Sequence, residues 1–530
     1  MLLAAAALWF CAAAAAAQNP RTILFVDDDD VLYRPGTIKR VVEFKKYSAN
    51  PVLPPEKPWE GNLGWTSVYR DPRTGKFQLW YQAYQEFRKE DKRFKCVVCY
   101  AESDDGIAWR KPTLGLFPFY EAKDTNIVLI GNEGGYGDRY CNSVVVDPRE
   151  PDATRRYKMV YYDWDAGSKG SGIHLAYSPD GIRWRKREEG MVLKTPFGGK
   201  GMPPPFQDEG IYFEEKLKDG AVRKSWRVPY AMSDATDVFY DPVRESYLLY
   251  GKMWTPFPDG SLSWKHGMGR TESKDLLHWS RPELVLTTDD RDAPQLEFHT
   301  SPVFFYNAMY FSLNQVLDRQ VGTIDAELIS SRDGFRWNRA YPSKWVIPRS
   351  RGDVFDSGSI LTNNTPIIVG DEMRFYYGAY RGTAIGAVGM TRQVIGSKDY
   401  FSGIGLAITP RDRFVAVQVN PASPVKEQRR DAPKLTNTIG NVTLRALDFT
   451  GVSSLTVNAD ASKGAVRVEL LDEDGFRLRG FTKDDAVPIA ADGLELRAAW
   501  KAKSLRELPA GRYLVRVHLE NAELFAVTLR

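Results

Sequence analysis

Four copies of one short signature are spaced along this chain, and they constrain its fold more than any other feature. Each copy begins with Ser, has Asp at its third position and ends with Trp at its seventh. The copies occupy residues 103–109, 178–184, 273–279 and 331–337, and a degenerate fifth copy occupies residues 409–414. Repetition on this scale is typical of repeat architectures, in which each copy belongs to one structural unit.

Each repeated unit is longer than its signature. An Asp-Pro pair precedes the signature Trp at a nearly constant distance in the first three units, at Asp71, Asp147 and Asp241. A short aromatic run lies between the pair and the signature, and such runs, bounded by turn residues, favour strands over helices. We therefore expect four antiparallel strands in each unit, which is typical of a β-propeller blade.

The sequence thus predicts an all-β chain with a five-bladed β-propeller followed by a C-terminal β-sandwich. We expect the signature Ser and Asp to hydrogen-bond the turn backbone, and the Trp to pack between blades. Residues 22–46 are expected to add an outer strand that closes the ring. A four-bladed ring is the alternative if the fifth copy is not a repeat. The expected blades lie near residues 60–110, 138–185, 230–280, 296–338 and 356–415.

Four segments are expected along the chain. Residues 1–17 are apolar and rich in Ala, which resembles a signal peptide and predicts a secreted or periplasmic protein. Residues 18–420 form the propeller and residues 421–433 a linker rich in proline and charge. Residues 434–530 show alternating apolar and polar positions, which favours a β-sandwich. This last segment carries no chemical motif and is interpreted as an accessory packing module, with carbohydrate binding as the alternative.

Composition excludes several classes of partner. The chain has 72 basic and 68 acidic residues, so its formal net charge of +4 gives no electrostatic case for nucleic acid. Beyond the signal peptide, no apolar stretch is long enough to span a membrane.

Cys96, Cys99 and Cys141 are expected to be buried thiols. With five His in the whole chain we expect no metal site, and nothing indicates a cofactor or an oligomeric state.

The chemistry of a propeller is expected in its central depression, which the innermost strand of each blade lines. The loops that lead into these strands carry acidic residues on several blades. Carboxylates gathered in one depression raise the pKa of one member, and a protonated acid beside an ionised partner can cleave a glycosidic bond. We therefore expect an oligosaccharide or polysaccharide substrate. The candidate catalytic residues are Glu297, Asp237, Asp356 and Asp138, and the candidate substrate-binding residues are Trp65, Arg139, Asp234 and His299.

Glu297 is the favoured general acid, because it is the only Glu in the loop that leads into the fourth blade; a surface salt bridge is the alternative. Asp237 occupies the position that Ser67 and Ser143 hold in the first two blades, which favours a base or a transition-state stabiliser over a turn-capping Asp. Asp356 is the comparable candidate on the fifth blade.

Two further pairs of residues complete the candidate site. Asp138 and Arg139 form either an ion pair or a contact to a sugar hydroxyl or carboxylate. Trp65 and His299 are candidates for a stacking wall and a hydroxyl contact, although most Trp residues here are expected in the core.

The chain resembles the five-bladed propeller glycoside hydrolases of families 32, 43 and 68, most closely bacterial family-32-like secreted proteins. The matching stretches are residues 24–28, 50–53, 57–61, 177–184, 239–242 and 356–358. This resemblance implies hydrolysis of a furanoside or related sugar by three acidic residues on the first three blades. The chain departs from that pattern, because residues 61–66 hold no Asp and the nearest acid is Glu60. Asp71 falls at a repeated turn and is interpreted as structural.

Three functions are therefore open. The first is an exported glycoside hydrolase that acts on a terminal sugar, with a furanoside as the expected substrate. The second is a carbohydrate-binding propeller without catalysis, which the missing acid of the first blade favours. The third is a sialidase-like exoglycosidase, which needs three converging arginines. The available arginines are Arg139, Arg270, Arg319 and Arg381.

Overall fold

The structure is a computed structural model of the chain. It describes residues 20–84, 95–132, 134, 140–164, 171–195, 212–226, 232–255, 258, 265–364, 366–382, 401–422 and 437–530. Within these residues the chain is all-β, as predicted, and its helical elements are two single 3₁₀ turns, η1 (Ala153–Arg155) and η3 (Leu505–Glu507). None of the helical elements in the described ranges is long and apolar enough to cross a membrane.

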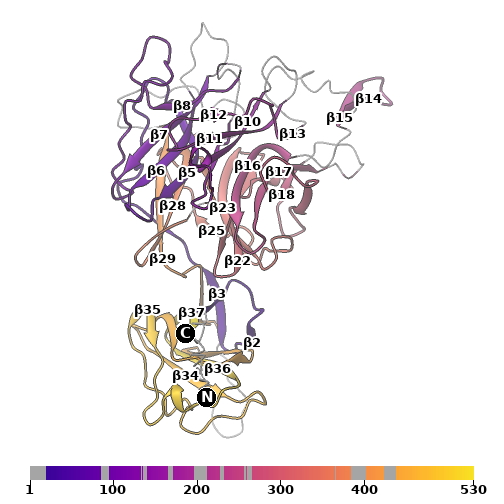
Figure 1. The fold of residues 1–530 in the computed structure, drawn as a ribbon. Coiled ribbons are helices and arrows are strands. Elements are labelled where there is room, and N and C mark those ends of the chain that lie inside the picture. The colour runs from indigo at the N-terminus through magenta and orange to yellow at the C-terminus, as the bar shows by residue number, and fades with distance from the viewer. Residues whose placement is uncertain are drawn as a thin grey trace, which may run out of the picture. The chain divides into compact units, whose positions relative to one another are not determined.

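The chain divides into two compact units. The larger unit is Val41–Arg411, and the smaller unit combines Met1–Arg40 with Asp412–Arg530. Figure 1 shows that strands from both ends of the sequence, coloured indigo and yellow, belong to the smaller unit.

The larger unit contains five antiparallel groups of strands in chain order. The first group is β5 (Asn62–Arg70), β6 (Phe77–Tyr84), β7 (Cys96–Ser103) and β8 (Ile127–Leu129). The second is β9 (Ser143–Val146), β10 (Tyr157–Trp164) and β11 (Ser171–Ser178), with β12 (Arg185–Lys186) and β13 (Leu193–Thr195) both pairing with β11. The third is β16 (Met232–Asp241), β17 (Ser246–Thr255), β18 (Lys265–Ser273) and β19 (Glu283–Leu286). A separate hairpin joins β14 (Tyr212–Lys216) to β15 (Val222–Trp226).

The last two groups have interrupted inner strands. In the fourth, β20 (Leu296–Thr300) and β21 (Val303–Tyr306) pair with β22 (Met309–Asp318), and β24 (Trp337–Asn338) and β25 (Trp345–Ile347) pair with β23 (Thr323–Ser331). In the fifth, β26 (Ser359–Leu361) and β27 (Ile367–Val369) pair with β28 (Glu372–Tyr380), followed by β29 (Ser402–Pro410) and β4 (Lys45–Lys46).

Each group packs against the next, and the fifth returns to the first. β5 contacts β9, β9 contacts β16, and β18 contacts β20. β23 pairs in parallel with β26 through Ile324 and Ser359, and β28 contacts β5. The five groups therefore succeed one another around a closed circuit, which brings the first strands of distant segments together.

The signature turns have the predicted hydrogen bonds. In the first copy the Ser103 hydroxyl donates to Asp105 and accepts the Gly106 N–H, while the Asp105 carboxylate accepts the N–H groups of Ile107 and Ala108. The same set recurs in the other three copies. One carboxylate and one hydroxyl thus fix each turn, as the sequence predicted.

The turns also join neighbouring groups. Tyr376 donates to the carbonyl of Gly106 at 2.7 Å, and its ring lies edge-on to that of Trp109, 5.7 Å away. Trp80 and Tyr250 occupy the same position in their own groups and make the same bond to the next turn, at Gly181 and Gly334. The predicted packing of the signature Trp between units is confirmed at Trp109, Trp184 and Trp337.

The smaller unit has two sheets. One is β3 (Thr37–Val41), β30 (Val415–Val419), β37 (Glu523–Leu529), β33 (Leu455–Asp460) and β35 (Asp492–Arg497), with β1 (Arg21–Leu24) on β37. The other is β2 (Val31–Tyr33), β31 (Ile439–Leu444), β36 (Arg512–Glu520) and β32 (Leu447–Asp448), with β34 (Ala465–Leu471) on β36. A single apolar core takes side chains from both sheets, among them Val457, Leu524, Val468 and Val517.

The N-terminal strands differ from the sequence-based expectation. Residues 22–46 were expected to close the ring of blades, but only β4 joins the fifth group, through Lys45 and Lys46. β1, β2 and β3 pair instead with strands of the smaller unit, where Ile23 and Val31 enter the apolar core. Burial of these side chains stabilises that unit and explains why the segment lies there.

Candidate active site

A buried polar cluster lies around Glu297 on β20. The Glu297 side chain is 1% exposed. Its Oε1 lies 2.8 Å from Nδ1 of His266, and its Oε2 accepts the backbone N–H of His266 at 3.1 Å. Arg319 approaches Oε2 more distantly, at 3.5 Å. One residue of β18 therefore holds both oxygens of a carboxylate from the next group.

These contacts decide the protonation of Glu297. Burial raises the pKa of a carboxyl, but the hydrogen bonds from His266 and the charge of Arg319 outweigh it and lower the pKa of Glu297 below its usual value. Glu297 is therefore ionised at neutral pH. An ionised carboxylate can act as a base or a nucleophile, whereas our sequence-based prediction made it the general acid.

His266 is the neutral partner in this pair. Burial lowers the pKa of His266, although the hydrogen bond to Glu297 opposes the shift. A neutral imidazole that donates from Nδ1 to a carboxylate carries its lone pair on Nε2. Nε2 is buried and has no hydrogen-bond partner among the described residues. The His266 ring also packs against the ring of Trp254, with centroids 3.9 Å apart.

A second carboxylate belongs to the same cluster. Asp234 on β16 forms an ion pair of 2.6 Å with Lys252 on β17, and both side chains are 5% exposed. Ser233 also donates to Asp234, at 3.1 Å. The charges of Lys252 and Asp234 both act on the pKa of His266. Asp234 and Lys252 therefore belong to the same electrostatic cluster as His266 and Glu297.

Two aromatic rings from distant groups meet beside these charges. Trp65 on β5 stacks on His299 of β20, with centroids 5.6 Å apart and planes at 24°. Gln315 Oε1 lies 3.1 Å from Nδ1 of His299. Burial first, and then the charges of Lys252 and His266, lower the pKa of His299 to about 3. The neutral His299 and Trp65 are both partly exposed and form a flat aromatic wall.

The Trp65 backbone explains how the first group reaches this site. Trp65 has a φ of 48°, at an irregularity in the pairing of β5 with β6 between Gly64 and Ser67. A left-handed backbone is uncommon for a bulky residue and is often found at functional positions. The bulge redirects the Trp65 side chain, which a regular strand would place by simple alternation.

The structure brings four of the predicted residues together: Glu297, Asp234, His299 and Trp65. Sequence reasoning missed His266, Lys252 and Trp254. It considered only the loops that lead into the innermost strands, whereas these three residues lie on β17 and β18, further out in the third group. The scarcity of His in the chain was the one available signal for His266.

Asp237 occupies a different place. Its Oδ1 accepts the Ser143 hydroxyl and the Val238 N–H, and its Oδ2 accepts the backbone N–H of Asn364 at 3.0 Å. The carboxylate thereby joins the second, third and fifth groups at their inner strands. Burial raises the pKa of Asp237 to about 7, although these three hydrogen bonds oppose the shift. These hydrogen bonds connect Asp237 to inner strands of neighbouring groups, and none of them joins it to the Glu297 cluster.

Asp356 is also engaged in a structural contact. It is 1% exposed, and its Oδ2 accepts Lys46 Nζ at 2.7 Å and the Tyr377 hydroxyl at 3.0 Å. This ion pair connects β4 to the rest of the fifth group. Glu60 is likewise buried and accepts from Lys111 and Tyr81.

The remaining predicted residues do not add to the cluster. Asp138 and Arg139 lie outside the described residues. Arg270 pairs with Glu272, and Arg381 pairs with Asp353. Among the described residues no group of His, Cys, Asp and Glu could hold a metal ion, and the three described cysteines are buried free thiols, as predicted.

Comparisons with known proteins give structural neighbours only. No known protein family matches the chain, and no curated protein matches it either. A solved structure described as a complex of BT0996 and RGII is 13% identical, with a TM-score of 0.45 over 74% of this chain and 96% of that one. One described as a glycoside hydrolase is 14% identical, with the same score and coverage. A glycosyl hydrolase from Bacteroides ovatus is 15% identical, with a TM-score of 0.42 over 71% and 95%.

Proposed function

We propose that the larger unit is a five-bladed β-propeller and that the smaller unit is a β-sandwich. Five antiparallel groups, each contacting the next and the fifth contacting the first, support the propeller. Two sheets that share one apolar core support the sandwich. In this arrangement three blades, the first, the third and the fourth, contribute side chains to the Glu297 cluster.

We infer that the protein is a glycoside hydrolase that removes a terminal sugar from an oligosaccharide or polysaccharide. The observation that carries this proposal is the ionised Glu297, held by His266, in one cluster with a second carboxylate, Asp234. Glycosidic cleavage commonly uses two carboxyl groups, one of which activates water or attacks the sugar carbon. Glu297 suits that role, because its pKa is held low.

Asp234 is the second carboxyl group of the proposed pair. Its charge and that of Lys252 both act on the pKa values of His266 and His299. The stacked rings of Trp65 and His299 offer a flat, partly exposed face against which a sugar ring can pack. A furanoside is the first substrate to test, since the resemblance to the family-32-type enzymes implies it, and residues 1–17 suggest export.

A non-catalytic carbohydrate-binding protein is the second candidate function. The loop that leads into β5 holds no Asp, so the first blade supplies the aromatic Trp65 to the cluster rather than an acid. A site with a stacking wall and neutral His299 can bind a sugar without cleaving it.

A panel of aryl glycosides, furanosides first, tests the two candidates. We expect release of the aryl group by the native protein and its loss in Glu297→Gln and in Asp234→Asn. The control is Asp353→Asn, because the Asp353 side chain is 84% exposed and pairs with Arg381. Turnover that survives both site substitutions rules out this assignment. Saturable sugar binding without turnover on any substrate of the panel favours the binding protein instead.

A further inference from the structure

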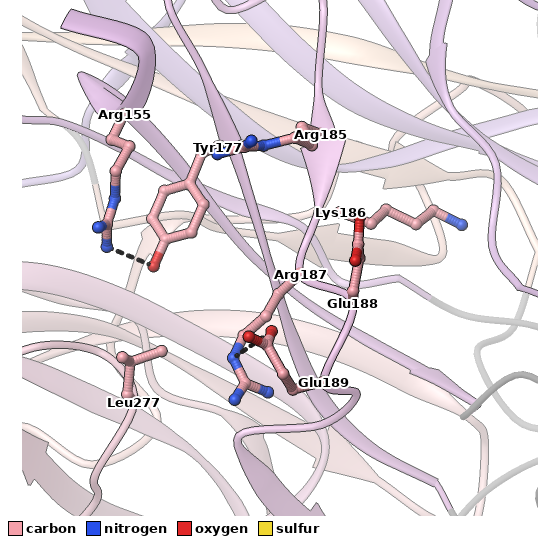
Figure 2. A pocket seen from close by; sticks show the side chains of 8 residues that line it. All are labelled: Arg155, Tyr177, Arg185, Lys186, Arg187, Glu188, Glu189 and Leu277. Atoms are coloured by element: carbon pink, nitrogen blue, oxygen red, sulfur yellow. Dashed lines mark hydrogen bonds and ion pairs between the residues drawn. The ribbon is translucent and has the colours of Figure 1, made fainter. Parts of the chain in front are cut away.

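A hollow lies beside the second group of strands, with Leu277 of the third group in its wall, and shares no residue with the Glu297 cluster. Its volume is about 340 Å³, and Figure 2 shows the side chains that line it. Four of these are basic and two are acidic. The basic residues come from η1, from β12 and from the residue after it, so two separate segments of the chain contribute positive charge.

Two of the guanidinium groups flank one tyrosine. Arg155 lies over the ring of Tyr177, 4.3 Å from its centroid, and its Nη2 donates to the Tyr177 hydroxyl at 2.9 Å. Arg185 is the cross-strand partner of Tyr177. The Nε of Arg155 is buried and unpartnered within the described residues, and neither Arg155 nor Arg185 forms an ion pair within them.

The acidic side chains of the hollow do not neutralise this pair. Glu189 pairs with Arg187 at 3.4 Å, and Arg187 also donates to the carbonyl of Gly190. Asp152, an exposed residue at the start of η1, is the acid on which the charges of Arg155 and Arg185 both act. It does not line the hollow, so both guanidinium groups can still meet a ligand there. The whole chain is nearly balanced in charge, so this concentration of positive charge is local to the hollow.

We propose that this hollow is a binding subsite for the sulfate or carboxylate group of an acidic polysaccharide. Guanidinium groups bind oxyanions through paired N–H donors, and a planar fork suits both groups. The volume lies within the range of sites that hold a small ligand, so one charged sugar fits. Tyr177 and Leu277 supply an apolar wall for the ring that carries the anion. The subsite is independent of the proposed hydrolase centre.

Calorimetric titration of the full chain with dextran sulfate, polygalacturonate and uncharged dextran tests the proposal. We expect binding to at least one acidic polymer and none to dextran, because the guanidinium groups supply the attraction. The Arg155→Gln/Arg185→Gln variant should bind at least tenfold more weakly. The polymer whose binding is lost identifies the bound group as sulfate or carboxylate.

Matched variants separate the subsite from general attraction. Arg73→Gln/Arg183→Gln removes the same charge from two side chains that are 79% and 72% exposed, and it should leave the affinity within twofold. Equal weakening by this control overturns the proposal. So does equal affinity for dextran, or binding of duplex DNA that needs the same two arginines.

Folding and catalysis are checked separately. Arg155 packs on Tyr177, so the single variant Arg185→Glu, at an exposed position, tests the charge without removing that contact. It should abolish polymer binding while the thermal unfolding midpoint stays unchanged. Unaltered binding in this variant contradicts the proposal. Turnover of small aryl glycosides should be the same in this variant as in the native protein. A negative result for polymer binding therefore does not bear on the proposed hydrolase, and a lack of turnover does not bear on the subsite.

Discussion

Glu297 and Asp237 are both carboxylates enclosed by inner strands of the larger unit, yet their surroundings shift their pKa values in opposite directions. Glu297 faces His266 and Arg319, and its pKa is lowered. Asp237 accepts only neutral donors, from Ser143, Val238 and Asn364, and burial raises its pKa to about 7. The comparison shows that a cationic or ionisable partner, more than the number of hydrogen bonds, decides whether a buried carboxylate stays charged.

The two carboxylates also differ in the hydrogen-bonding capacity that their partners leave unused. His266 Nε2 is buried and has no hydrogen-bond partner among the described residues, so the Glu297 pair keeps one unused acceptor. Asp237 uses its oxygens to hold inner strands of three groups together. The proposed function therefore rests on Glu297, whereas Asp237 connects inner strands of three groups.

The largest expected effect is the loss of activity in Glu297→Gln. The amide keeps the shape of the side chain but removes the negative charge that a base or nucleophile needs. We expect kcat/KM to fall by about 10³-fold, within the usual range for a positioned acid–base group. Steady-state kinetics on the best aryl glycoside measure the loss.

Asp237→Asn is the control for this loss. It should retain activity within about tenfold, because the Asp237 carboxylate makes no contact with the Glu297 cluster in the described contacts. Equal loss of activity in both variants, with both folded, would contradict the division of roles between the two carboxylates.

The second effect is the pH dependence of stability. The folded state binds the Asp237 proton more tightly than the unfolded chain does, so this residue makes the protein less stable as pH rises from about 4 to about 7. A shift of this size corresponds to up to about 4 kcal/mol. The Asp237→Asn side chain cannot ionise. The unfolding temperature of the variant, relative to that of the native protein, should therefore rise as the pH rises.

Differential scanning calorimetry between pH 4 and pH 8 follows this difference directly. The other carboxylates also make stability depend on pH, but their contributions cancel in the comparison because they are present in both proteins. A difference that stays constant across the range would mean that Asp237 titrates normally in the fold.

The third effect concerns the acid limb of the activity profile. His266→Leu removes the hydrogen bond that lowers the pKa of Glu297, while the burial that raises it remains. The acid limb of kcat/KM should then move upward by about one pH unit, which corresponds to about 1.4 kcal/mol. Arg319→Gln serves as the graded comparison, since Arg319 lies at 3.5 Å and is 47% exposed, and should shift the limb less. If the acid limb of kcat/KM lies at the same pH in His266→Leu as in the native protein, Glu297 does not control that limb.

Local features of the fold were predictable from the sequence, and non-local ones were not. The Ser and Asp of each signature bond to the backbone within three residues, so the turns at Asp105 and its equivalents follow from the sequence alone. The pairing of β1 with β37 joins residues about 500 positions apart, and nothing within Arg21–Leu24 marks its partner. The sequence therefore predicted the repeated turns but not the pairing of the N-terminal strands.

The candidate site shows the same limit. Glu297, Asp234 and His299 were predicted because they lie near the start of inner strands, where position in the repeat is informative. His266 was missed because its role depends on a contact across two groups, between β18 and β20. The general-acid role predicted for Glu297 did not take His266 into account, whose hydrogen bond lowers the pKa of that carboxyl.

The smallest expected effect separates two equivalent serines. Ser67 and Ser143 both connect their own inner strand to the next one, but only Ser143 also donates to a carboxylate, Asp237. Each Ser→Ala change should cost about 1 kcal/mol for the lost hydrogen bond. Ser143→Ala also removes a donor that favours the Asp237 carboxylate, so its cost should increase above pH 7, whereas that of Ser67→Ala should stay constant. Unfolding midpoints at pH 5 and pH 8 measure both costs, and equal pH dependence in the two variants would show that Ser143 does not support the charge on Asp237.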